Sequence, residues 1–156
     1  MRIATYVWGG QRHVGQVSAD GKEVKPFALD KAEASKGALS IIQKLASGGE
    51  LPVMAGTSLP VSAVHLEAPI PEPLRNVWCV GRNYHEHAKE LSTSVFKDND
   101  VNPESWPIVF TKVPECVIGP MDDVQLPGAA ISDQIDYEAE LTVIIGKGGK
   151  NITKAD

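Results

Sequence analysis

The chain has 156 residues, enough for one ordinary domain or for a small domain with part of another. Its 42% hydrophobic and 22% charged residues are typical of a globular protein. A net charge of −5 excludes the basic footprint of a nucleic-acid-binding protein, and no apolar run approaches the roughly 20 residues that span a bilayer. Two cysteines and a start without a signal-peptide pattern predict a reduced, cytoplasmic protein.

Residues 1–68 carry the pattern of a small α+β domain. Gly9-Gly10 is a two-residue signal for a hairpin turn. The expected strands are Arg2 to Trp8, Gln11 to Val17, Glu23 to Phe27 and Val61 to Leu66. Before the last of these the period changes: Ala38, Ile41, Ile42 and Leu45 stand at i, i+3, i+4 and i+7, which predicts an amphipathic helix.

Residues 69–75 form an expected linker, because proline at every second position makes a segment stiff and unfit for a central strand. Residues 76–156 then form a second, strand-rich domain. Its expected elements are a buried strand at Asn76 to Val80, a short helix at Tyr84 to Leu91, and short strands at Pro107 to Thr111, Val117-Ile118 and Val124 to Leu126. The fold class expected from this order is α+β and mostly β.

The most informative segment is Asp136-Tyr137-Glu138-Ala139-Glu140-Leu141, which runs into the apolar stretch Thr142 to Gly146. In a strand, Asp136, Glu138 and Glu140 share one face, and the apolar stretch indicates burial on both faces. Acids that enter a buried strand need a compensating cation, and a hard divalent metal such as Mg²⁺ or Mn²⁺ prefers their oxygen ligands. The alternative is the wet face of an edge strand, where alternating acids are common.

Two further segments carry candidate chemistry. His87 and Glu90 stand at i, i+3 and would share a helix face, where the carboxylate would orient the imidazole and raise its basicity for activating a water. The alternative is a surface histidine beside a solvated glutamate. Lys112 lies in an apolar strand, where it either extends to the surface or faces an anion-binding site.

Taken together, these blocks resemble the fumarylacetoacetate hydrolase family. The resemblance rests on Gly81-Arg82-Asn83-Tyr84 with His87 and Glu90, on Phe110-Thr111-Lys112 with Pro114, on Gly119-Pro120, and on Asp136 to Leu141 with Ile145-Gly146-Lys147. Their order and spacing also match, and they cover about residues 70–150. The resemblance implies a small N-terminal domain followed by the first part of a mixed β-sandwich-roll catalytic domain.

The resemblance also implies the roles of individual residues. Glu138 and Glu140 would be two ligands of a Mg²⁺ or Mn²⁺ ion, whereas Asp136 is in the motif without being assigned as a ligand. His87 and Glu90 would form the water-activating dyad, and Lys112 would contact substrate oxygens. Substrate binding would be shared by Arg82, Asn83, Tyr84 and Lys112.

The function implied for the intact protein is a metal-dependent hydrolase that cleaves a C–C bond in acylpyruvate-like or fumarylacetoacetate-like diketo acids, working as a homodimer. One alternative is a decarboxylase, hydratase or isomerase of the same family, because these reactions share a metal-bound enolate. A third acidic ligand of the family would lie beyond residue 156, which makes an N-terminal fragment the expectation. The other alternative is therefore a non-catalytic fragment or assembly module.

Overall fold

A computed structural model gives the structure of the chain and describes residues 1–81, 83–84 and 106–155. The chain divides into two compact units, one formed by Met1–Pro71 with Ile118–Asp156 and one by Glu72–Val117. The predicted domains, with bounds at 1–68, 69–75 and 76–156, stay a prediction. None of the helices within the described ranges is long and apolar enough to cross a membrane.

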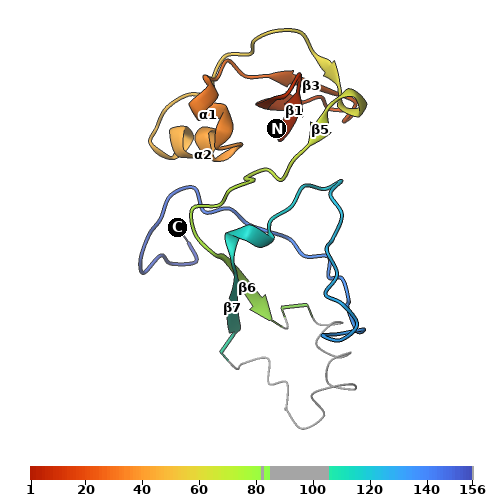
Figure 1. Cartoon of the computed structure of the whole chain (residues 1–156). Coiled ribbons are helices and arrows are strands. Elements are labelled where there is room, and N and C mark those ends of the chain that lie inside the picture. The colour runs from red at the N-terminus through yellow and green to blue at the C-terminus, as the bar shows by residue number, and fades with distance from the viewer. Residues whose placement is uncertain (82, 85–105, 156) are drawn as a thin grey trace. The chain divides into compact units, whose positions relative to one another are not determined.

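A five-stranded antiparallel sheet forms the body of Met1–Pro71, here called the N-terminal unit, which is the first part of the first compact unit (Figure 1). Its strands are β1 (Arg2–Trp8), β2 (Gln11–Val17), β3 (Glu23–Pro26), β4 (Leu59–Pro60) and β5 (His65–Leu66), in the order β4-β3-β2-β1-β5. The predicted hairpin is confirmed, with Trp8 opposite Gln11 across the turn. Both turn glycines, Gly9 and Gly10, have positive φ, which a tight two-residue turn needs and glycine adopts without steric cost.

The sheet has to curl, because its two edge strands are consecutive in sequence. From Pro60 in β4 to His65 in β5 the chain takes five steps, which reach at most about 17 Å. The edges of a flat five-stranded sheet stand about 19 Å apart. A 3₁₀ turn, η1 (Val61–Ala63), shortens the connection further. The strand predicted over Val61 to Leu66 is therefore confirmed only at its end, His65–Leu66, since the chain turns before it to pass from one edge to the other.

Two helices, α1 (Lys31–Ser35) and α2 (Leu39–Ala46), pack beside the sheet (Figure 1). The predicted amphipathic helix is confirmed as α2, and its Ile41 is buried against Val14 and Phe27 in the core. Helix α1 was not predicted. It is set by a capping box in which Asp30 accepts from the Glu33 amide while the Glu33 carboxylate accepts from the Asp30 amide.

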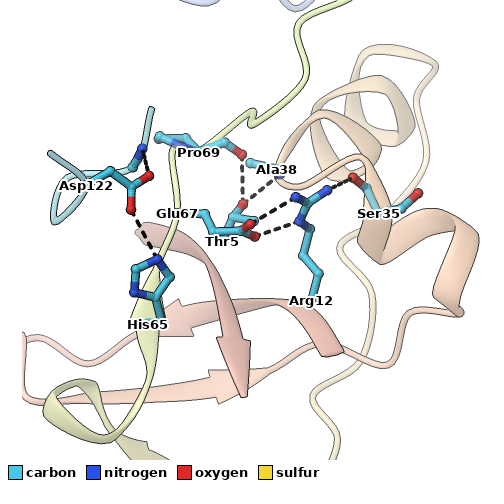
Figure 2. A network of polar contacts seen from close by, with 9 residues as sticks. Thr5, Arg12, Ser35, Ala38, His65, Glu67, Pro69 and Asp122 are labelled. Carbon is cyan, nitrogen blue, oxygen red and sulfur yellow. Dashed lines mark hydrogen bonds and ion pairs between the residues drawn. The ribbon is translucent and has the colours of Figure 1, made fainter. Parts of the chain in front are cut away.

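A polar network fixes the segment that leaves this unit (Figure 2). Arg12 in β2 donates to both carboxylate oxygens of Glu67, at 2.6 and 2.9 Å, and to the carbonyl of Ser35 at 2.7 Å. This fork-to-carboxylate geometry is stronger than a single ion pair. The hydroxyl of Thr5 donates to the Pro69 carbonyl at 2.7 Å. The start of the proline-rich segment is thus fastened to the sheet.

Gly37 lies close to the same network, and replacing it by alanine is expected to destabilise the chain by about 2–4 kcal/mol. Its φ is +61°, and an added Cβ would lie 2.6 Å from the Pro69 carbonyl oxygen and 2.9 Å from the Thr5 hydroxyl. Backbone strain and a lost Pro69 contact therefore add. Urea unfolding followed by circular dichroism measures the change in the free energy of unfolding.

Gly48 provides the matched control for that measurement. It also has a positive φ, +82°, but a Cβ there would meet nothing within 4 Å. Gly48→Ala should cost only the backbone strain, about 1 kcal/mol. Equal losses for Gly37→Ala and Gly48→Ala would show that close packing against Pro69 contributes nothing.

The second unit contains one pair of antiparallel strands that lie far apart in the sequence. Strand β6 (Val77–Gly81) pairs antiparallel with β7 (Ile108–Lys112), close to the two strands predicted there, and a 3₁₀ turn, η2 (Pro114–Cys116), follows. The predicted burial of the first strand is wrong, because Trp78 is 72% exposed and no residue of β6 is buried. From Ile118 the chain belongs to the first unit, and the short strands predicted at Val117-Ile118 and Val124 to Leu126 are absent. A turn closes that region instead, in which Asp122 accepts from the Gly119 amide at 2.7 Å.

The strand predicted at Asp136 to Gly146 is also absent, since this segment belongs to neither sheet and is exposed throughout. Burial on both faces was therefore wrong for the chain as described. A strand needs a neighbouring strand that hydrogen-bonds to its backbone N–H and C=O groups, and the described residues provide no such strand beside this segment. The expected fold class, α+β and mostly β, is confirmed.

Candidate functional site

Lys112 is the predicted site residue that the structure places in a regular element. It ends β7, directly opposite Val77 in β6. Alternation along the ladder puts Phe110 and Ile108 on the same face as Lys112, together with Val77 and Cys79 of the partner strand. The β6 residues on this face are less exposed than Trp78 on the other. Lys112 itself is exposed, so its ammonium is open to an anionic ligand.

Asn83 and Tyr84 follow the other end of the same hairpin. The register pairs Gly81 with Ile108, four residues from the Val77–Lys112 pair, which separates the two ends by about 13 Å along the strands. Both side chains are exposed. To contact one small substrate, the side chains of Lys112 and of this loop would therefore have to extend toward each other along the hairpin. The predicted residues Arg82, His87 and Glu90 lie outside the described residues, and their roles stay predictions.

Glu138 and Glu140 lie in the other compact unit, in the exposed segment that forms no strand. The neighbouring Asp136 accepts a hydrogen bond from the Tyr137 amide at 2.8 Å. Within the ranges that the structure describes, no group of three or more His, Cys, Asp or Glu side chains is placed to hold a metal ion. The role of the two glutamates as metal ligands stays a prediction.

The donor chemistry of Glu138 and Glu140 nevertheless fits a hard divalent cation. Mg²⁺ is usually bound through one or two carboxylates, with water or substrate oxygens in the remaining positions. Both carboxylates are exposed and follow each other at i, i+2, the spacing that puts two side chains on one face of a strand. The pair can therefore serve as the protein part of a Mg²⁺ or Mn²⁺ site once the segment is extended.

Residues 76–156 match the family described as fumarylacetoacetate (FAA) hydrolase C-terminal. The chain belongs to this family. The match spans all the residues predicted for the site, from Arg82 to Glu140. The resemblance stated from the sequence motifs is thereby confirmed.

Two curated relatives of this fumarylacetoacetate hydrolase family chain are named as tautomerases. The oxaloacetate tautomerase YisK of Bacillus subtilis (strain 168) is 45% identical over 96 residues, which are 62% of this chain and 30% of the relative. The mitochondrial oxaloacetate tautomerase FAHD2A of Homo sapiens is 39% identical over 128 residues, which are 82% of this chain and 34% of the relative. The chain thus spans about a third of the length of these relatives.

A solved structure supports the same membership. Fumarylacetoacetate hydrolase (EaFAH) from psychrophilic Exiguobacterium antarcticum superposes with a TM-score of 0.69 at 29% sequence identity. The superposition covers 98% of this chain and 50% of that chain. The fold of the family member described here therefore corresponds to half of the solved relative.

Proposed function

We propose that this chain supplies part of the active site of a divalent-metal-dependent enzyme that interconverts the enol and keto forms of oxaloacetate or a closely similar 2-oxo acid. The observation that carries this proposal is the name shared by two relatives of 45% and 39% identity, both oxaloacetate tautomerases. The family match over residues 76–156 contains every proposed site residue. An isomerase is thus better supported than the C–C hydrolase that the motifs first suggested.

Each proposed residue has a task that the reaction needs. In the enol-to-keto direction, one proton leaves the C2 hydroxyl and one joins C3, so the formula of the substrate is unchanged. His87, oriented by Glu90, would take the proton from the C2 hydroxyl as general base and then deliver a proton to C3 as general acid. Lys112 and Arg82 would hold the substrate carboxylates, with Asn83 and Tyr84 as further polar contacts.

Glu138 and Glu140 would hold the Mg²⁺ or Mn²⁺ ion through their carboxylates. When bound, such an ion supplies Lewis-acid polarisation of a 2-oxo group and its neighbouring carboxylate. Lys112 would stabilise the negative charge that the substrate oxygens carry. A homodimer in the cytoplasm remains the proposed setting, as the sequence first indicated.

The test compares substrates on two preparations. The first is the 156-residue chain, and the second is a fusion of this chain to the part of the Bacillus subtilis relative that follows the matched segment. With Mn²⁺ present, we expect enzyme-dependent loss of the ultraviolet absorbance of enol oxaloacetate, at least a hundredfold faster than cleavage of an acylpyruvate. Proton exchange at C3, followed by nuclear magnetic resonance in ²H₂O, provides a second readout.

The measurement with an acylpyruvate distinguishes enol–keto tautomerisation from C–C bond hydrolysis. Faster cleavage of an acylpyruvate than enol–keto exchange would contradict the tautomerase and restore the hydrolase. Absence of both activities in both preparations would instead favour a non-catalytic module. Chelation with EDTA provides the control, since a metal-dependent activity has to disappear and to return with added Mn²⁺.

A further inference from the structure

The turn from Gly119 to Asp122 is closed by one carboxylate. The Gly119 amide donates to Oδ2 of Asp122 at 2.7 Å, and the Asp122 amide donates to the Gly119 carbonyl at 3.2 Å. Oδ1 of the same carboxylate lies 3.4 Å from Nε2 of His65 (Figure 2). The two oxygens of Asp122 therefore have different tasks, since one closes the turn and the other faces strand β5.

The turn and β5 belong to the same compact unit and lie close to each other. A Cβ added to Gly119 would come within 3.0 Å of the Leu66 carbonyl oxygen in β5 and within 2.9 Å of the Asp122 carboxylate. Strand β5 lies at an edge of the described five-stranded sheet, with β1 as its neighbour, so its other side can receive the turn. The two segments thus meet at the backbone as well as through the side chain of His65.

The other charges around His65 leave Asp122 as its ionic partner. His65 lies opposite Val7, and Val7 lies opposite Arg12, so these side chains share one face of the sheet. Arg12 is already paired with Glu67 through two hydrogen bonds, and η1 carries no charged residue. Of the described groups, Asp122 lies within ion-pair distance of His65. The remaining charged residues of β1 and of residues 119–123 are Arg2 and Asp123.

We propose that His65 and Asp122 form a pH-dependent latch that holds the turn of residues 119–122 on strand β5. An imidazole changes its charge between about pH 5 and pH 8. At the acid end of this range His65 is positively charged, whereas carboxylates are still ionised, so the two side chains attract each other. This attraction holds the Asp122 carboxylate where it accepts from the Gly119 amide. As the pH rises the attraction is lost, and the turn loosens from β5.

The expected effect is modest, because both side chains reach solvent. His65 is 55% exposed and Asp122 is 42% exposed, and water and salt weaken an ion pair at such a place. Loss of the charge on His65 should therefore increase the opening of the turn by about two- to fivefold. The inference is independent of the proposed function, since neither residue belongs to the proposed active site.

The amide proton of Gly119 reports the latch, because its chemical shift follows its hydrogen bond to Asp122. In a nuclear magnetic resonance titration of the 156-residue chain, this shift should move with the same midpoint as the ring protons of His65. Solvent exchange of the amide, corrected for its intrinsic pH dependence, should be about two- to fivefold faster at pH 8 than at pH 5.5. High salt should reduce this difference, since ions screen the pair.

Two substitutions locate the source of the pH dependence. His65→Gln removes the titrating charge and keeps a side-chain donor, so the Gly119 amide should exchange at the fast alkaline rate throughout. His13→Gln is the matched control, since His13 lies in the same sheet on the opposite face, where its ring stacks on Tyr6 at 5.6 Å. It should leave the titration of Gly119 unchanged. Protected amides in β1 and β2 show that each variant is folded.

The outcomes decide whether the ion pair acts as a latch. A Gly119 amide that does not respond to pH in the unmodified chain would overturn it. The same titration of Gly119 in His65→Gln would also overturn it, because another group would then be the source. Asp122→Asn keeps an acceptor for the Gly119 amide but removes the charge, so it should abolish the pH dependence as His65→Gln does. Persistence of the dependence in Asp122→Asn would contradict the proposal.

Discussion

Replacing His87 by alanine should lower kcat for enol–keto exchange by about 10²–10⁴-fold, the usual contribution of a positioned general acid–base. Such a loss corresponds to about 3–5 kcal/mol of transition-state stabilisation. The affinity for Mn²⁺ should stay within about twofold, since an imidazole that moves the proton is not a metal ligand. Steady-state kinetics of the active preparation and calorimetric Mn²⁺ titration measure the two quantities.

His85 offers a matched control for this substitution, two residues away in the same segment. It has no carboxylate at i+3 placed as Glu90 is for His87, so His85→Ala should leave kcat within about threefold. Glu90→Gln keeps the shape of the side chain but removes the charge that orients His87, so it should lower kcat by an intermediate factor. Equal losses for His85→Ala and His87→Ala would contradict the assignment.

The segment Met1–Pro71 was largely predictable because its signals are local. Gly9-Gly10 specifies the hairpin between β1 and β2, and the spacing around Ile41 specifies α2. Helix α1 is too short for a periodic pattern, yet Asp30 and Glu33 form the capping box that would have revealed it. The passage between β4 and β5 could not be read locally, since it depends on both edges of the curled sheet.

The region 136–146 shows the opposite limit of sequence reasoning. Its pattern predicts a strand that is buried on both faces and has a cation near its acidic residues. It does not state whether neighbours that bury both faces are present, and in the structure Val143 and Ile145 remain exposed. A strand without a neighbouring hairpin partner depends on a segment far away in sequence or in another molecule. The motif therefore indicated the family correctly and the local conformation incorrectly.

The residues of the candidate site also differ in how well the sequence predicted their local structure. Lys112 lies in the strand that the apolar pattern predicted, because β6 and β7 complete each other within one unit. Glu138 and Glu140 were found through the spacing of their charges, although they belong to no helix or strand of the described residues. The sequence of a family member shows the types and the order of its site residues. The distances between the side chains of these residues depend on the whole folded domain.

Glu138→Gln and Glu140→Gln should each weaken Mn²⁺ binding by about 10²-fold, equivalent to about 2.7 kcal/mol. Each substitution keeps the size of the side chain and one acceptor oxygen but removes a negative charge that a hard divalent cation prefers. The double substitution should abolish measurable binding and enol–keto exchange together. Calorimetric titration of the fusion with Mn²⁺ gives the affinities.

Asp136→Asn is the control that separates direct metal ligation from the effect of the segment's negative charge. It removes the same charge from the same segment, but the Asp136 carboxylate already accepts from the Tyr137 amide. Because Asp136 is not assigned as a ligand, Asp136→Asn should weaken Mn²⁺ binding by less than about fivefold, the size of a screened electrostatic effect through space. If all three substitutions weaken binding equally, the segment attracts cations only by its net charge. A selective loss at Glu138 and Glu140 would instead identify a built pair of ligands, since only inner-sphere oxygens distinguish residues two positions apart.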